Sequence, residues 1–242
     1  SALRVLCLQE DSADDVIEML KGAMAEYRLG NPDRLSVDIG PVIDSGARAG
    51  IEKHIQSMRT KGRNVYQVAI ANAEETSRGT YVVPTLIELQ SIEELEREIF
   101  GPVLHIVRYA RKDLDRLVEQ INNCGYGLTL GVHTRIDETI AKVIDNAHVG
   151  NIYVNRNVVG AVVGVQPFGG EGLSGTGPKA GGPLYLYRLL SARPVNAISS
   201  SFQRNISFCT MNVSERSFRS APIDELKKWA ADNKRESLVG LC

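Results

Sequence analysis

The sequence predicts an α/β fold in which helices cover both faces of a parallel-rich sheet. Short apolar segments alternate with helical patterns as far as Asn155, and this alternation is typical of βαβ units. A glycine-rich, apolar run at 155–179 follows the last of these strands. Because ligands bind beyond the carboxyl ends of strands in such sheets, we expect the run to line a ligand site.

The elements can be assigned in order from hydrophobic periodicity. Extended segments are expected at 4–8, 66–70, 81–87, 102–107, 128–133 and 151–155. Helices are expected from a cap at Asp11 or Ser12 to the turn at Gly30, and at 46–62, 91–97, 112–123 and 136–147. Pro84 restricts its segment to an edge or a break in the sheet, because proline cannot donate to a strand ladder.

Two domains of unequal size are expected. Residues 1–198 read as a truncated portion of one catalytic domain. Residues 199–242 turn polar and serine-rich, and read as a tail or part of an extra domain. A strand pattern begins almost at Ser1, with no lead-in, which indicates a piece of a longer chain.

Composition excludes several classes of partner. The formal net charge is -1, with 28 basic and 29 acidic residues, which gives no basis for binding nucleic acid or an anionic membrane. No apolar run approaches the ~20 residues of a membrane span. The cysteines and histidines are scattered without metal-ligand spacing, so we expect no metal and a reducing, cytoplasmic setting.

The glycine-rich run has two candidate contact points. Gly160 and Ala161 can present adjacent backbone N–H groups to a carboxylate, although a tight turn is equally compatible with the sequence. Phe168 can flank an apolar substrate stem or anchor the loop in the core, and anchoring is the default. The valines of the run are too apolar for a solvated tail.

A second candidate lies at the corner before the strand at 102–107. Glu98 can accept two hydroxyl hydrogen bonds from a ribose, with Phe100 packing nearby. The alternative is a solvated glutamate beside a core phenylalanine, and spacing alone favours that alternative. No Cys or Ser lies beside a plausible base, and the glycines form neither a dinucleotide fingerprint nor a P-loop.

Four motifs carry a resemblance to a known family. They are Glu98-Ile99-Phe100-Gly101-Pro102-Val103, Asn151-Ile152-Tyr153-Val154-Asn155-Arg156, Gln166-Pro167-Phe168-Gly169-Gly170, and the run from Gly172 to Pro183. Residues 1–195 resemble the aldehyde dehydrogenase superfamily. Within it they are most similar to the L-glutamate γ-semialdehyde (Δ1-pyrroline-5-carboxylate) dehydrogenases of bifunctional proline-utilisation flavoproteins.

The resemblance implies a role for each candidate residue. In these enzymes the nucleophilic Cys precedes Ser-Ala-Leu-Arg, as in Ser1-Ala2-Leu3-Arg4, so the chain is expected to begin one residue after the nucleophile and to hold no catalytic residue. Glu98 is implied to bind the nicotinamide ribose of NAD, with Phe100 beside it. The implied substrate contacts are Ser1, Gly160 and Ala161 on the α-carboxylate, and Phe168 on the aliphatic stem.

The implied reaction is oxidation of L-glutamate γ-semialdehyde to glutamate in proline catabolism. A thiolate attacks the aldehyde, hydride passes to NAD, and water hydrolyses the thioester. The chain alone is expected to be inactive, because the nucleophilic Cys, the general-base Glu and most of the Rossmann domain would lie in the N-terminal part of the same polypeptide.

Other implications concern the parent protein. It is expected to be a homo-oligomer, with residues 194–198 in the oligomerisation strand, and any FAD is expected only in a separate proline dehydrogenase domain. The alternative function is a non-catalytic aldehyde-dehydrogenase-like module for assembly or channelling. That alternative predicts a residue other than Cys before Ser1.

Overall fold

The computed structural model describes residues 2–69, 76–158, 162, 165–175 and 177–185. Its strands are β1 Val5–Gln9, β2 Val65–Gln67, β3 Thr85–Leu89, β4 Val103–Tyr109, β5 Tyr126–Gly127, β6 Thr129–Val132, β7 Asn151–Val154 and β8 Glu171–Gly172. Its helices are α1 Glu10–Ala25, α2 Ser45–Thr60, α4 Leu114–Asn123 and α5 Asp137–Asn146, with short 3₁₀ turns η1 Ile92–Glu94 and η2 Arg111–Asp113.

The chain divides into two compact units. One comprises Leu3–Gln120, and the other comprises Ser1–Ala2 with Ile121–Cys242. No helix among the described residues is long and apolar enough to cross a membrane. Residues 199–242 lie outside the described part, so the domain division at residue 198 stays a prediction.

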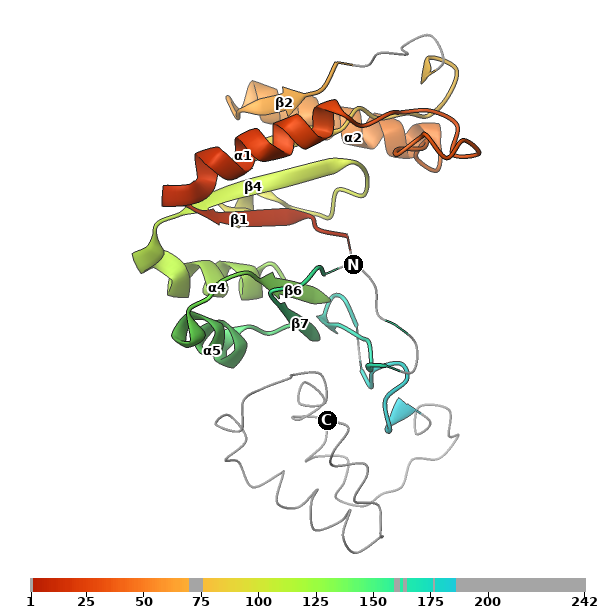
Figure 1. Cartoon of the computed structure of the whole chain (residues 1–242). Coiled ribbons are helices and arrows are strands. Elements are labelled where there is room, and N and C mark those ends of the chain that lie inside the picture. The colour runs from red at the N-terminus through yellow and green to blue at the C-terminus, as the bar shows by residue number, and fades with distance from the viewer. Residues whose placement is uncertain (1, 70–75, 159–161, 163–164, 176, 186–242) are drawn as a thin grey trace, which may run out of the picture. The chain divides into compact units, whose positions relative to one another are not determined.

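A four-stranded sheet of order β1-β4-β3-β2 forms the centre of the unit Leu3–Gln120 (Figure 1). β4 pairs in parallel with both β1 and β3, and β2 is antiparallel to β3 at the edge. His105 lies opposite Val5 on one side and Ile87 on the other. The parallel-rich sheet expected from the sequence is therefore confirmed.

Helices cover both faces of this sheet. On one face, α1 contributes Ala13, Ile17 and Met24 to a buried cluster with apolar side chains of β1, β3 and β4, namely Leu8, Leu86 and Ile106. Strand side chains alternate between faces, so His105 projects from the other face. There it contacts His54 of α2, whose apolar stripe is also buried.

The prediction of an acidic helix at 91–97 is wrong. Only the turn η1 forms, and Leu95 is already extended. Ser91 and Glu94 make a reciprocal capping box, and Arg63 also holds the Glu94 carboxylate at 2.7 Å. The capping box is a signal for the start of a helix, but the turn ends at Leu95. Just beyond it, Arg4 binds the side chain of Glu98 and the carbonyl of Ile99, so contacts with residues distant in sequence override the local helix signal.

The observed bounds of other elements differ from the predicted ones by a few residues. β2 ends at Gln67 rather than Ile70, and β3 begins at Thr85, directly after Pro84, rather than at Tyr81. α1 begins at Glu10, and neither Asp11 nor Ser12 caps it; its N-cap Gln9 makes no side-chain capping bond.

The described part of the second unit contains a βαβ arrangement. β6 and β7 pair in parallel, and α5 connects them. β7 buries Asn151 and Tyr153 on one side, and α5 buries Val143 and Ile144. β5 and β8 form a two-residue antiparallel pair that joins the chain after β7 back to this unit.

Candidate functional site

Three candidate side chains meet where β1 and β4 begin. Arg4 directly precedes β1, while Glu98 and Phe100 precede β4, and the parallel pairing of these strands brings their amino ends together. Arg4 Nε lies 3.2 Å from Glu98 Oε1. The Arg4 guanidinium carbon lies 4.3 Å from the centre of the Phe100 ring. We call Arg4, Glu98 and Phe100 the β1–β4 cluster.

The corner that carries Glu98 and Phe100 is also held through its backbone. Arg4 Nη1 donates to the carbonyl of Ile99 at 3.1 Å and to that of Gly101 at 3.4 Å. Arg4 therefore uses its Nε, its Nη1 and its flat face on one four-residue segment. Sequence reasoning named Glu98 and Phe100 but missed Arg4, whose only signal was its place at the start of a strand.

Exposure argues against a core role for Phe100. The residue is 73% exposed, so the alternative of a core phenylalanine is wrong for this chain. The Glu98 side chain is 45% exposed and the Arg4 side chain 24%. Large apolar side chains are usually buried, and an exposed aromatic ring beside a held carboxylate suits a ligand that has both a hydroxyl and an apolar face.

The chemistry of the cluster fits a ribose. Arg4 takes Glu98 Oε1, and among the described residues Oε2 has no hydrogen-bond donor. A carboxylate oxygen left open to solvent can accept from a sugar hydroxyl. The cluster lies at the amino ends of β1 and β4, whereas the general rule for parallel sheets predicts ligand sites at the carboxyl ends of the strands.

Two histidines, His54 and His105, support the β1–β4 cluster from the face of the sheet that α2 covers. The backbone N of His105 donates to the Arg4 carbonyl at 3.1 Å, and its Nδ1 lies 3.3 Å from the same oxygen. His105 Nε2 lies 2.9 Å from His54 Nε2. A carbonyl only accepts, so Nδ1 of His105 carries its proton, and Nε2 accepts from His54.

Both histidines are held neutral. Burial, and then the neighbouring His54, lower the pKa of His105 to about 4. Burial, with repulsion from Arg97 and Lys61, lowers the pKa of His54. The pair therefore acts as a neutral hydrogen-bonded link between α2 and the Arg4 backbone at neutral pH.

The glycine-rich run is fixed by residues that sequence reasoning did not single out. Asn151, 3% exposed, donates from Nδ2 to the Pro167 carbonyl at 3.1 Å and accepts from the Gly169 N–H at 3.3 Å. These two bonds bracket Phe168. Asn151 opens a strand, where a buried polar residue is uncommon, and this was the signal available.

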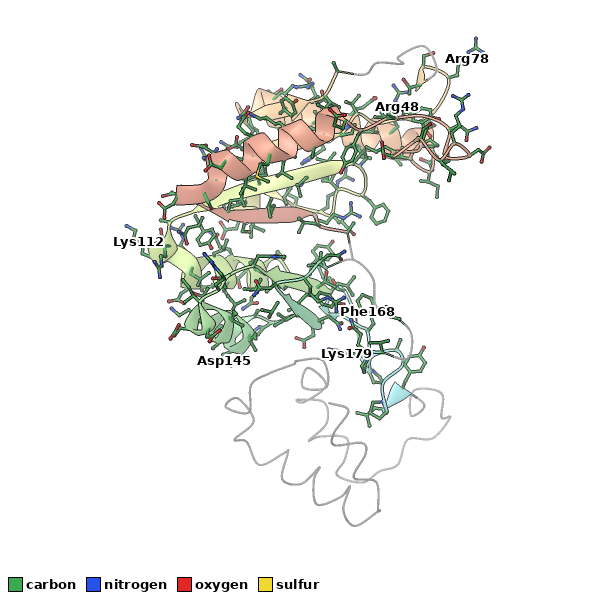
Figure 2. The ribbon with its side chains drawn as sticks, viewed as in Figure 1. Arg48, Arg78, Lys112, Asp145, Phe168 and Lys179 are labelled. Carbon is green, nitrogen blue, oxygen red and sulfur yellow. The ribbon has the colours of Figure 1, made fainter. Side chains whose placement is uncertain are left out.

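Phe168 is half-buried. Its backbone exchanges two 2.9 Å hydrogen bonds with Ala180. Lys179, whose ammonium donates to the Gly150 carbonyl, lies on the same stretch of chain (Figure 2). Phe168 belongs to the unit Ile121–Cys242 and the β1–β4 cluster to the other unit. Ser1, Gly160 and Ala161 lie outside the described residues, so their substrate contacts stay predictions.

Cys7 and Cys124 are the two cysteines among the described residues, and neither forms a disulfide. Burial raises the pKa of the Cys7 thiol to about 12, so its reactive thiolate is scarce at neutral pH. Cys124 donates from its thiol to the Ile121 carbonyl at 2.8 Å. Within the described ranges, no group of three or more His, Cys, Asp or Glu side chains is arranged to hold a metal.

The chain is similar to known proteins at the level of family and of individual sequences. Residues 1–195 match the model of the aldehyde dehydrogenase family. The chain is 63% identical, over its full length, to the bifunctional protein PutA of Salmonella typhimurium, but spans only 18% of that protein. It is 35% identical to a 1-pyrroline-5-carboxylate dehydrogenase of a Geobacillus species, over 81% of the chain and 37% of the relative.

A solved structure of a related protein is also similar to this chain. A crystal structure of a proline utilization A (PutA) mutant from Bradyrhizobium japonicum aligns with a TM-score of 0.71 and 51% identity. The alignment covers 77% of this chain and 18% of that one.

Proposed function

Because this chain belongs to the aldehyde dehydrogenase family, we propose that it supplies the substrate-facing and ribose-facing surfaces of an NAD-dependent L-glutamate γ-semialdehyde dehydrogenase. The reaction oxidises the semialdehyde to glutamate in proline catabolism. The similarity to PutA and 1-pyrroline-5-carboxylate dehydrogenases supports this substrate.

The observation that carries the proposal is the β1–β4 cluster. An exposed aromatic ring and a half-exposed carboxylate lie on one corner, both in contact with Arg4. NAD, when bound, accepts the hydride. The contribution of this chain is positional: the open oxygen of Glu98 accepts a hydrogen bond from the nicotinamide ribose, and the Phe100 ring limits where that ribose can lie.

The substrate side of the proposal rests on the glycine-rich run. The backbone N–H groups of Gly160 and Ala161, helped by Ser1, bind the α-carboxylate, and Phe168 packs on the aliphatic stem. The hydrogen bonds of Asn151 to the residues on either side of Phe168 support this role, because they fix the backbone that carries the Phe168 ring.

The chemical step requires residues that we assign to a longer polypeptide. We place the nucleophilic Cys directly before Ser1 and the general-base Glu and most of the Rossmann domain further upstream. The raised pKa of Cys7 supports a nucleophile elsewhere. On this proposal the parent is cytoplasmic and homo-oligomeric, and any FAD belongs to a separate proline dehydrogenase domain.

The test uses the full-length polypeptide that carries this segment. NAD reduction is measured with L-glutamate γ-semialdehyde and with butanal, an aldehyde of similar length that lacks the α-amino acid group. We expect glutamate as the product and a far higher kcat/KM for the semialdehyde. Absence of NAD reduction with the semialdehyde, or equal kcat/KM for both aldehydes, would contradict the proposal.

A further inference from the structure

We propose that Arg4 is a positioning residue for the cofactor: it orients the Glu98 carboxylate and the Phe100 ring toward the nicotinamide ribose. This inference rests on the proposed function, because it takes the β1–β4 cluster to be the ribose site. Arg4 itself touches neither substrate nor hydride; it acts through Glu98 and Phe100.

The contacts of Arg4 converge on one corner of the fold. Nε pairs with Glu98 Oε1, Nη1 donates to the carbonyls of Ile99 and Gly101, and the guanidinium plane lies over Phe100. An arginine can make such contacts together because its donors form a rigid planar fork. A lysine has one compact charge and lacks the flat face that stacks on an aromatic ring.

The two carboxylate oxygens of Glu98 have different surroundings. Arg4 holds Oε1, and Oε2 has no donor among the described residues. Fixing one oxygen sets the rotation of the carboxylate, so the other has a defined direction in which to meet a hydroxyl. An exposed glutamate without such a partner loses side-chain entropy when it binds a ligand, and Arg4 removes part of that cost in advance.

Arg4 is itself held in place through its backbone. Its carbonyl accepts from both the backbone N and Nδ1 of His105. His105 is 2% exposed and is held in turn by His54. The guanidinium therefore extends from a backbone that is hydrogen-bonded to β4, an inner strand of the sheet, and this fixes its position relative to the exposed corner.

A purely stabilising ion pair is the alternative. Partly exposed pairs contribute little to folding, and this one lies beside a 73% exposed ring. The unit offers a matched comparison at the opposite end of β4. Arg108 pairs with Asp14 and Glu88 at 2.7 and 2.8 Å near the carboxyl end of β4, whereas Glu98 and Phe100 precede its amino end. If Arg4 only stabilised the fold, the two arginines would behave alike toward NADH.

The experiment measures NADH binding to the full-length polypeptide by NADH fluorescence, together with KM for NAD and kcat. We expect Arg4→Ala to raise the NADH Kd and the KM for NAD about tenfold, with a smaller change in kcat. Arg4→Lys is expected to fall between wild type and Arg4→Ala. Arg108→Ala, the control, is expected to leave the NADH Kd unchanged.

A double substitution tests whether Arg4 acts through Glu98. In a Glu98→Ala background, Arg4→Ala is expected to weaken NADH binding far less than it does in wild type. Full additivity, or an unchanged NADH Kd in Arg4→Ala while Glu98→Ala weakens binding, overturns the inference and leaves the proposed function standing. An unchanged NADH Kd in Glu98→Ala overturns the ribose site itself. If Arg4→Ala fails to fold, Arg4→Lys carries the same comparison.

Discussion

Residues at the start of β4 show how a buried polar group can serve an exposed one. His105 sits in an apolar strand, yet both of its side-chain nitrogens have partners, the Arg4 carbonyl and His54. Buried polar groups destabilise a fold unless they are hydrogen-bonded. These hydrogen bonds link His54 of α2, through His105, to the backbone of Arg4, which pairs with Glu98. The histidine pair therefore helps to hold the candidate site in place.

The histidine pair predicts a pH dependence. The pKa of His105 is lowered from 6.5 to about 4, so the unfolded chain binds the proton more readily than the folded one. Stability is therefore greatest above pH 6.5 and falls as the pH drops toward 4. The loss amounts to about 3 kcal/mol at most, the free-energy equivalent of that pKa difference.

His105→Leu removes this titration. At neutral pH it should cost about 1–3 kcal/mol, because His54 loses its acceptor and the Arg4 carbonyl loses a donor. Its stability should then depend less on pH than that of wild type. Hydrogen exchange of the β4 peptide in the full-length protein, corrected for intrinsic exchange rates, measures both effects. His148→Gln, at an exposed position, is the control, and an unaltered pH dependence in His105→Leu would exclude this explanation.

At the scale of elements, the segment before β4 is shaped by close packing. A Cβ on Gly101 would lie 2.5 Å from Cδ1 of Ile51, which is buried in α2. The corner that carries Glu98 and Phe100 therefore rests directly on α2. Any side chain at position 101 must displace either Ile51 or the corner.

Gly101→Ala is expected to reduce stability by about 1–3 kcal/mol, the usual range for overpacking, and to weaken NADH binding because the corner shifts. Gly22→Ala is the matched control: a Cβ there meets nothing within 4 Å, and alanine in a helix should stabilise by about 0.5–1 kcal/mol. Hydrogen exchange of the β4 peptide and NADH fluorescence give the two readouts. Unchanged NADH affinity in Gly101→Ala would show that the corner does not need this packing.

The glycine-rich run makes its own prediction. Asn151→Ala removes both bonds that bracket Phe168 and should destabilise by about 1–3 kcal/mol, because the Pro167 carbonyl and the Gly169 N–H lose their partner. The KM for the semialdehyde should rise while the NADH Kd stays near wild type. Asn146→Ala, which removes a single exposed bond to the Lys142 carbonyl, serves as the control. A KM equal to wild type in Asn151→Ala would separate Phe168 from substrate binding.

Most elements could be predicted because their apolar periodicity is strong, as in α2 and in the pair β6 and β7. The segment at 91–97 could not, because its capping box favours a helix, whereas the single turn that forms is held by contacts such as the ion pair of Glu94 with Arg63. Arg63 is distant in sequence, so no local pattern reveals it. Arg4 was missed for the same reason: its partners lie about a hundred residues further along.

At the scale of the whole molecule, the chain is one segment of what its relatives contain. It covers 18% of the PutA proteins it resembles. The motifs that carried the resemblance mark corners and loops rather than the nucleophile, so family membership was readable from sequence while the complete site was not. We propose that the complete site forms only in the full-length polypeptide, so the contact between Glu98 and the ribose is tested there.

The most direct measurement is a crystal structure of the full-length protein with NAD bound. The account predicts a nicotinamide ribose hydroxyl within about 2.6–3.2 Å of the Glu98 carboxylate, the Phe100 ring beside that ribose, and Arg4 still paired with the other Glu98 oxygen. A bound nicotinamide ribose that lies away from Glu98 and Phe100, with the β1–β4 cluster still intact and facing solvent, would contradict it.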